Sequence, residues 1–235
     1  SVAPYPAELT DYGQILAQPS LRHPMGTDHL GRDLLSRLMA GTRTTLGLGL
    51  LVAVLSSALA LAIGALCGFA GGWLDASLMR LVDALLALPG FLLAVCFLGL
   101  FGGGVFQLVL YLVLIGWAQL ARIVRNEVAV ARNLDFITAN TAAGYSTARN
   151  LFRHVLPAVL PSVLVLLMNT LVGDIFAIVS LSFLGLGISP QIPEWGTTLF
   201  DARSFFLASP WLFAFPSALI GALTLGLHLL ADGLR

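Results

Sequence analysis

The chain has 235 residues, of which 58% are hydrophobic and only 10% charged, and its mean hydropathy is +0.92. A soluble globular domain carries about 25% charged residues, so this composition excludes a water-soluble fold and makes membrane lipid the first expected partner. Twelve basic residues balance twelve acidic ones, and the resulting net charge of zero argues against nucleic acid as a partner.

Residues 1–45 are polar and loop-like, with four prolines as helix breakers. We assign them to an extramembrane or interfacial segment that leads into a short amphipathic helix over 34–40. Asp33 and Arg37 stand at the i,i+4 spacing at which helix side chains meet, and they are expected to pair. The rest of the chain, residues 46–235, is expected to form the transmembrane domain.

Five apolar stretches are expected to cross a bilayer, since each approaches or exceeds the roughly 20 residues that a crossing helix needs. They are 46–69, 76–100, 105–120, a stretch within 155–186, and 211–230. Gly71 and Gly72 are expected to end the first span, and Pro89 to kink the second. Because the chain opens on a polar segment without Met, we expect a sixth, N-terminal span to precede it.

A polar island interrupts the apolar runs at residues 122–157. It holds five of the twelve basic residues: Arg122, Arg125, Arg132, Arg149 and Arg153. Such an island must lie in water on one side of the bilayer. Apolar residues at helical spacing on both sides of Gly144 predict two short helices joined at that glycine, where a backbone bends without a Cβ penalty. Their apolar edge indicates a soluble partner.

The island resembles the EAA loop of permease subunits of bacterial ABC importers, which reads Glu-Ala-Ala, three residues, Gly, nine residues and Ile-x-Leu-Pro. Four positions match at the family's spacing: Ala139, Gly144, Leu156 and Pro157. Three positions depart from it: Thr138, Asn140 and His154. The segments 23–46, 68–93, 181–187 and 193–203 are similar to the dipeptide, oligopeptide and nickel permease family, in its second-permease type.

This resemblance implies an all-α, multi-pass protein of the bacterial cytoplasmic (inner) membrane, with a type I ABC importer permease core and residues 1–45 in the periplasm or at its interface. It implies that about 132–157 form a cytoplasmic coupling helix that contacts an ATPase. The implied contact residues are Phe136, Ile137, Thr138, Ala139, Asn140, Ala142, Gly144, Tyr145, Arg149, Leu151, Arg153, Leu156 and Pro157. At Thr138 the coupling role rests on shape and hydrogen bonding, because the family's glutamate charge is missing there.

The implied partners are a homologous second permease, two cytoplasmic ATPase subunits and an extracytoplasmic solute-binding protein. ATP and Mg²⁺ are implied to bind the ATPase subunits. This chain has no GxxxxGK[ST] phosphate loop, so we expect it to be no enzyme and to bind no cofactor. Its side chains show no metal-ligand spacing.

Asp174 is the strongest candidate for lining the translocation path, because an ionisable group at membrane depth is functional by default. Asn169 lies nearby, and Ile178 lies one helical turn beyond Asp174 and is expected to share its face. The alternative for Asp174 and Asn169 is a structural hydrogen bond to a neighbouring helix.

The expected function is a permease subunit that forms half of an ATP-driven path for small peptides or a related solute. Nickel or a metal–chelator complex is the alternative cargo within the same family. An ATP-independent channel or secondary carrier is the alternative of another class, and the chain shows neither the internal repeats nor the run of intramembrane charges that a carrier needs.

Overall fold

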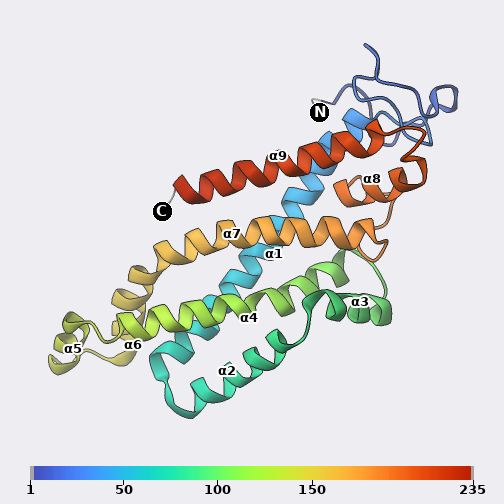
Figure 1. Cartoon of the computed structure of the whole chain (residues 1–235). Helices are drawn as coiled ribbons and strands as arrows, with labels where there is room; N and C mark the ends of the chain where they lie inside the picture. Colours follow the sequence, from blue (N-terminus) through green and yellow to red (C-terminus); the bar gives the residue numbers. More distant parts are fainter. Residues whose placement is uncertain (1–2, 234–235) are drawn as a thin grey trace.

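The computed structural model describes residues 3–233, apart from the side chain of Asp232, and every regular element in that range is helical (Figure 1). The elements are η1 (Tyr12–Gln14), α1 (Leu34–Ala70), α2 (Gly72–Ala87), α3 (Gly90–Phe101), α4 (Val105–Ala131), α5 (Asp135–Ala142), α6 (Thr147–Asn150), η2 (Leu151–Val155), α7 (Leu156–Phe183), α8 (Trp195–Ala202), η3 (Arg203–Phe205) and α9 (Trp211–Gly233). The predicted all-α class is confirmed.

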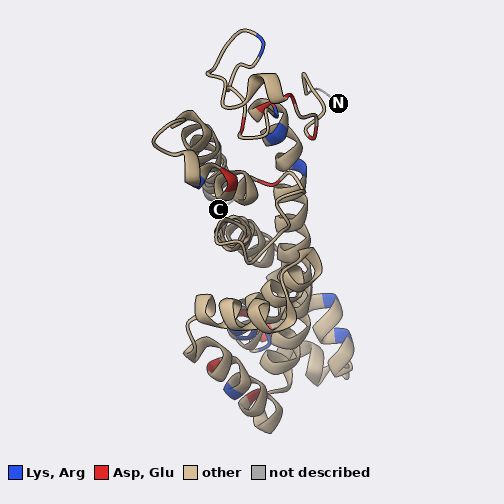
Figure 2. Ribbon diagram, turned by 90° about the vertical axis from the view of Figure 1, so that its right-hand side faces the viewer, with Lys and Arg blue, Asp and Glu red and all other residues tan. Residues whose placement is uncertain are grey.

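Five bilayer crossings fit the helices by length and composition. Four come from α1, from α4, from the continuous helix Thr147–Phe183 and from α9, and the fifth is α2 with α3, which meet at an angle of 86°. In Figure 1, α4, α7 and α9 lie side by side while α1 crosses behind them. Figure 2, seen from the right-hand side of Figure 1, shows few charged residues among many uncharged ones and groups most of them in the upper and lower parts of the view. The predicted number of crossings is confirmed when the bent pair counts as one.

Helix α1 differs from the prediction, because the short helix 34–40 and the span 46–69 are one helix of 37 residues. Asp33 caps it by accepting a hydrogen bond from the Ser36 backbone N–H at 2.8 Å, and its other oxygen lies 2.9 Å from His23 Nδ1. Arg37 turns instead toward Asp28 and Asp201, 3.8 and 4.0 Å away. The predicted Asp33–Arg37 pair is therefore wrong: Asp33 is already engaged as the helix cap.

The expected kink at Pro89 is a full break. Helix α2 ends at Ala87 and α3 begins at Gly90. Between them Leu88 is extended, with φ −95° and ψ 138°, as sterics with the proline ring favour for the residue that precedes a proline.

Helices α1 and α4 pack backbone to backbone at their ends nearest the polar island. Gly64 and Gly68 face α4 so closely that an added Cβ would lie 2.7 Å from the Ala121 carbonyl oxygen and 2.4 Å from that of Arg125, respectively. Arg132 extends the contact by donating to the Phe69 carbonyl oxygen at 2.7 Å. The end of α4 and the turn after α1 are therefore held together.

A polar cap covers the opposite end of the molecule and consists of residues 3–33, α8 and η3. Trp195 is fully buried there and donates its indole N–H to the Leu38 carbonyl oxygen at 3.1 Å. Glu194 is also fully buried and accepts hydrogen bonds from the Thr197 N–H at 2.9 Å and the Thr45 hydroxyl at 3.2 Å. These bonds join α8 to the first turns of α1.

The buried Glu194 carboxyl predicts a pH-dependent stability. Burial raises its pKa above the ordinary value of 4.5, and the hydrogen bonds it accepts oppose that rise only in part. The folded state therefore binds the carboxyl proton more tightly than the unfolded state does. The stabilisation of the fold by this protonated carboxyl is fully present below pH 4.5 and is lost as the pH rises through the folded-state pKa. Relative to Glu194→Gln, the wild-type Tm is expected to fall as the pH rises from 4.5 to 8, measured on the detergent-purified complex. A Tm difference that stays constant with pH would contradict this assignment.

Candidate functional site

Residues 132–157, which were predicted to couple to an ATPase and which we call the coupling segment, project from the end of α4 away from the cap (Figure 1). Its two short helices, α5 and α6, are joined at Gly144, as the sequence predicted. Gly144 has φ +84° and donates its N–H to the Thr141 carbonyl oxygen at 3.0 Å. That left-handed conformation strains any residue with a Cβ, which explains the glycine at this turn.

Two of the predicted contact residues face inward and anchor the segment. Ile137 and Leu151 are buried and pack with Val124 and Val128 of α4 and Ala65 of α1. The resemblance implied that both residues contact the ATPase, but they are covered by α1 and α4 and do not belong to the exposed edge. Their burial fixes α5 and η2 on the ends of α1 and α4.

A polar contact that the sequence did not reveal braces the same turn. Asn150 is 1% exposed and donates its side-chain amide to the Thr141 hydroxyl at 3.1 Å, across the loop that contains Gly144. Thr141 in turn donates to the Ile137 carbonyl oxygen at 2.9 Å. No sequence motif links the two residues, because the loop between them brings them together only in the folded chain.

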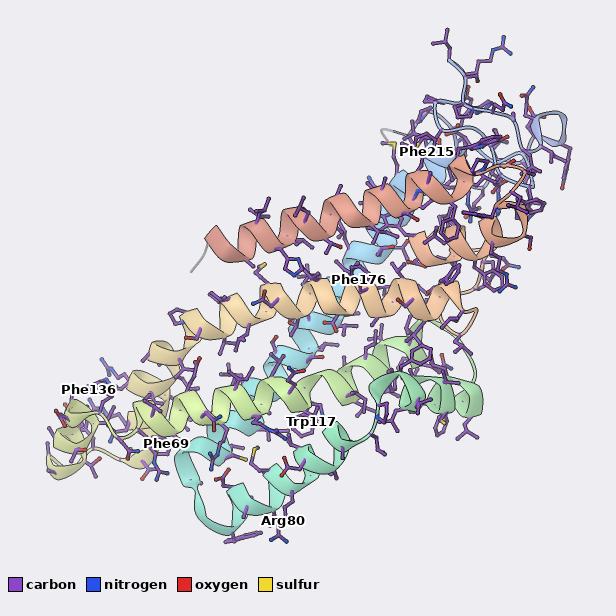
Figure 3. All side chains as sticks on the ribbon, viewed as in Figure 1. Phe69, Arg80, Trp117, Phe136, Phe176 and Phe215 are labelled. Carbon is purple, nitrogen blue, oxygen red and sulfur yellow. The ribbon has the colours of Figure 1, made fainter. Side chains whose placement is uncertain are left out.

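The outer edge of the coupling segment carries exposed aromatic residues. Phe136 is 49% exposed and Phe152 is 69% exposed, and Figure 3 shows Phe136 at the tip of the molecule. The Arg149 guanidinium lies 4.3 Å from the centre of the half-exposed Tyr145 ring. The other predicted contact residues are exposed or half-buried: Thr138, Ala139, Asn140, Ala142, Arg153, Leu156 and Pro157. An apolar edge of this kind in water is typical of a docking surface.

The coupling segment continues directly into α7. Helix α6, the π-helical turn η2 and α7 form one helix of 37 residues, Thr147–Phe183. Pro157 follows the π turn and lacks an N–H for the regular ladder, which accounts for the altered hydrogen bonding at this point. A displacement of α6 is therefore passed to α7 without an intervening loop.

A groove runs between α4 and α7 and consists of two hollows of about 350 and 340 Å³. Both hollows are lined by Gly116 and Asp174, so they meet at these residues. Asn169 lines the second hollow beside Gln119. The structure thus brings Asp174 and Asn169 together on one surface, which we call the α4–α7 groove.

Ile178 does not belong to this groove, which corrects the prediction. It is 0% exposed and packs in the core with Val52 of α1 and Leu108 of α4. Four residues exceed one α-helical turn of 3.6 residues, so Ile178 is rotated from Asp174 toward α1, while Ala177 and Leu181 line the hollow instead.

Comparison with known proteins identifies the family. The profile of the family described as "Binding-protein-dependent transport system inner membrane component" matches residues 60–235. The chain belongs to this family. It is therefore a multi-pass permease of a binding-protein-dependent importer with the type I permease fold, and the predicted resemblance is confirmed.

Its relatives include glutathione transport system permease proteins GsiD. The protein of Pectobacterium atrosepticum is 37% identical over 233 residues, which cover 99% of this chain and 77% of that protein. Those of Escherichia coli O6:K15:H31 and Shigella boydii serotype 4 are each 36% identical over 235 residues, which cover 100% of this chain and 78% of theirs. Membership of the family implies ATPase and solute-binding partners and sets aside the channel and carrier alternative.

Proposed function

We propose that this chain is one of two homologous permease subunits of a bacterial inner-membrane importer of small peptides, with the tripeptide glutathione as the first cargo to test. The names of its relatives support this cargo, and they favour it over nickel or a metal–chelator complex. A solute-binding protein outside the membrane would deliver the peptide. The second permease would cover the open side of the α4–α7 groove and complete the path.

One observation carries the mechanism: an apolar edge of the coupling segment is exposed beyond the spans, and the same helix continues into the groove-lining α7. We infer that this edge docks on a cytoplasmic ATPase subunit. ATP and Mg²⁺ would bind there, and closure of two such subunits would move the coupling segment. Because Ile137 and Leu151 anchor it to α1 and α4, that movement would rock the spans as a packed body.

Reconstitution tests this proposal. The chain is purified with its second permease and two ATPase subunits, placed in liposomes, and supplied with the solute-binding protein and radiolabelled glutathione. Uptake that requires ATP and all subunits is the expected result. Uptake by this chain without the ATPase subunits would overturn the proposed energy source. Import of radioactive nickel with no import of glutathione or small peptides would overturn the proposed cargo.

Phe136→Ser tests the docking edge. Burying a phenylalanine at an interface contributes about 1.5–3 kcal/mol, so this variant is expected to bind the ATPase subunit at least about tenfold more weakly. Affinity is measured by titrating detergent-purified permeases with the ATPase subunit. Phe206→Ser is the matched control, because Phe206 is 52% exposed at the cap end and should leave affinity unchanged. Equal affinities for the two variants would place the docking surface elsewhere.

A further inference from the structure

The α4–α7 groove contains an acidic side chain that lies within a membrane-spanning helix. Asp174 lies on α7 where the two hollows meet. Figure 3 labels Phe176, two residues further along, on the stretch of α7 that lies between the charged ends of the molecule. The groove is otherwise lined by apolar and neutral polar side chains, among them Gln119, Asn169 and Ser180.

This carboxyl group has no counter-charge within the groove. Its Oδ2 atom is buried and accepts no hydrogen bond within residues 3–233, and none of the residues that line the two hollows is basic. The Thr170 hydroxyl, which also lines the groove, donates to the Leu167 carbonyl oxygen at 2.9 Å. Asp174 is half-buried, and its Oδ2 atom is an acceptor without a donor among the described residues. A positive group beside it would offset the cost of burying this carboxyl.

The nearest arginines along α4 are directed away from the groove. Arg122 pairs with Asp83 and Arg125 pairs with Asp75, both of which belong to α2. Helix α2 packs on the side of α4 that carries the buried Trp117, which lines neither hollow. Arg122 and Arg125 thus pair on the side of α4 that faces α2, and Asp174 lines the groove between α4 and α7.

The dimensions of the groove suit a small peptide. Hollows of about 350 and 340 Å³ fall in the range of about 300–1,000 Å³ that small-molecule sites occupy. An ammonium group is compact and donates three hydrogen bonds, whereas the carboxylates of a peptide would be repelled by Asp174. The amide side chains of Gln119 and Asn169 can both donate and accept hydrogen bonds and therefore suit the peptide groups that follow.

We propose that Asp174 binds the primary ammonium group of the cargo during its passage and so makes the path selective for peptides with a free amino group. This inference rests on the proposed import of small peptides and deepens it. Asn169 and Gln119 would contact the uncharged part of the same cargo. The interaction is an ion pair and involves no covalent step.

The first test compares two probes in the reconstituted transporter, namely glutathione and N-acetylglutathione, whose amino group is blocked. Loss of a charge-assisted hydrogen bond predicts that Asp174→Asn lowers glutathione uptake about tenfold or more and does not lower uptake of the acetylated probe, whose carboxylates are no longer repelled. Each probe is compared only with itself, so selection by the solute-binding protein cancels. Asp174→Glu should keep most of the preference. Glu8→Gln removes an exposed carboxylate of the cap, outside the groove, and should change neither uptake.

A second test needs only glutathione and applies even where the acetylated probe is not delivered. Cys67 and Cys96 are free thiols and are first replaced by serine, and Asp174→Cys is added. Reaction with an anionic sulfonatoethyl thiosulfonate is expected to restore uptake, and a neutral methyl thiosulfonate should not.

Three outcomes would overturn the inference. They are unchanged glutathione uptake by Asp174→Asn, an equal loss of uptake for both probes, and equal rescue by the neutral and anionic reagents. Equal rescue together with loss of the second permease on purification would assign Asp174 to the permease interface. A wild-type complex that imports nickel and no peptide would instead refute the proposed cargo, so the two failures are distinguishable.

Discussion

Gly144→Pro is expected to abolish ATP-driven uptake while the chain still inserts in the membrane. Proline fixes φ near −65°, whereas residue 144 has φ +84°. The substitution also removes the N–H that Gly144 donates to Thr141. Refolding of this turn would separate α5 from α6 and break the contact between Asn150 and Thr141. The ATPase subunits would then move without displacing α7.

The measurement is cargo-stimulated ATP hydrolysis beside uptake in the same proteoliposomes. Basal hydrolysis should persist, and stimulation by the loaded solute-binding protein should be lost. Gly144→Asn is the matched control, since asparagine visits the left-handed region more readily than other residues with a Cβ. It should retain most uptake, because a Cβ at this position meets nothing within 4 Å. Normal stimulation in Gly144→Pro would refute the coupling assignment.

The bilayer crossings and the coupling turn could be predicted because their signals are local. Charge density distinguishes the island from the spans, and a glycine between two short apolar stripes in a polar segment favours a turn. The break at Pro89 was foreseen as a kink, but its angle depends on how α3 packs on α4. The local sequence therefore predicts that the helix is interrupted at Pro89, whereas the direction of α3 after the break depends on tertiary contacts.

The errors arose where a partner far along the chain decides the outcome. The short helix 34–40 and the span 46–69 were predicted as separate, yet α1 continues between them through Gly41, where an added Cβ would lie 3.0 Å from Trp195 Cδ1. Ile137 and Leu151 were assigned to the outer edge because apolar spacing identifies an apolar helix face but does not identify which part of the protein packs against it. Ile178 was assigned to the groove for the same reason, since α1 covers it.

Gly68→Leu is expected to have the largest effect on stability. A Cβ at this position would lie 2.4 Å from the Arg125 carbonyl oxygen and 2.9 Å from the Val128 Cβ. The nearest clashing atom belongs to the backbone of α4 and cannot rotate away as a side chain can. The clash is therefore removed only if α1 moves away from α4. That movement would also weaken the bond between Arg132 and the Phe69 carbonyl and the packing beneath the coupling segment. We expect a loss of about 3 kcal/mol, at the upper end for overpacked cores.

The loss should appear as a lower Tm of the detergent-purified complex and a reduced amount of chain in the membrane. Gly47→Leu is the matched control, because it makes the same change in the same helix where an added Cβ meets nothing within 4 Å. Its Tm should stay close to that of the wild type. Equal Tm values for the two variants would show that α1 and α4 can separate at little cost. Movement of α4 would then not be passed to α1, and the two helices could not rock as one body during transport.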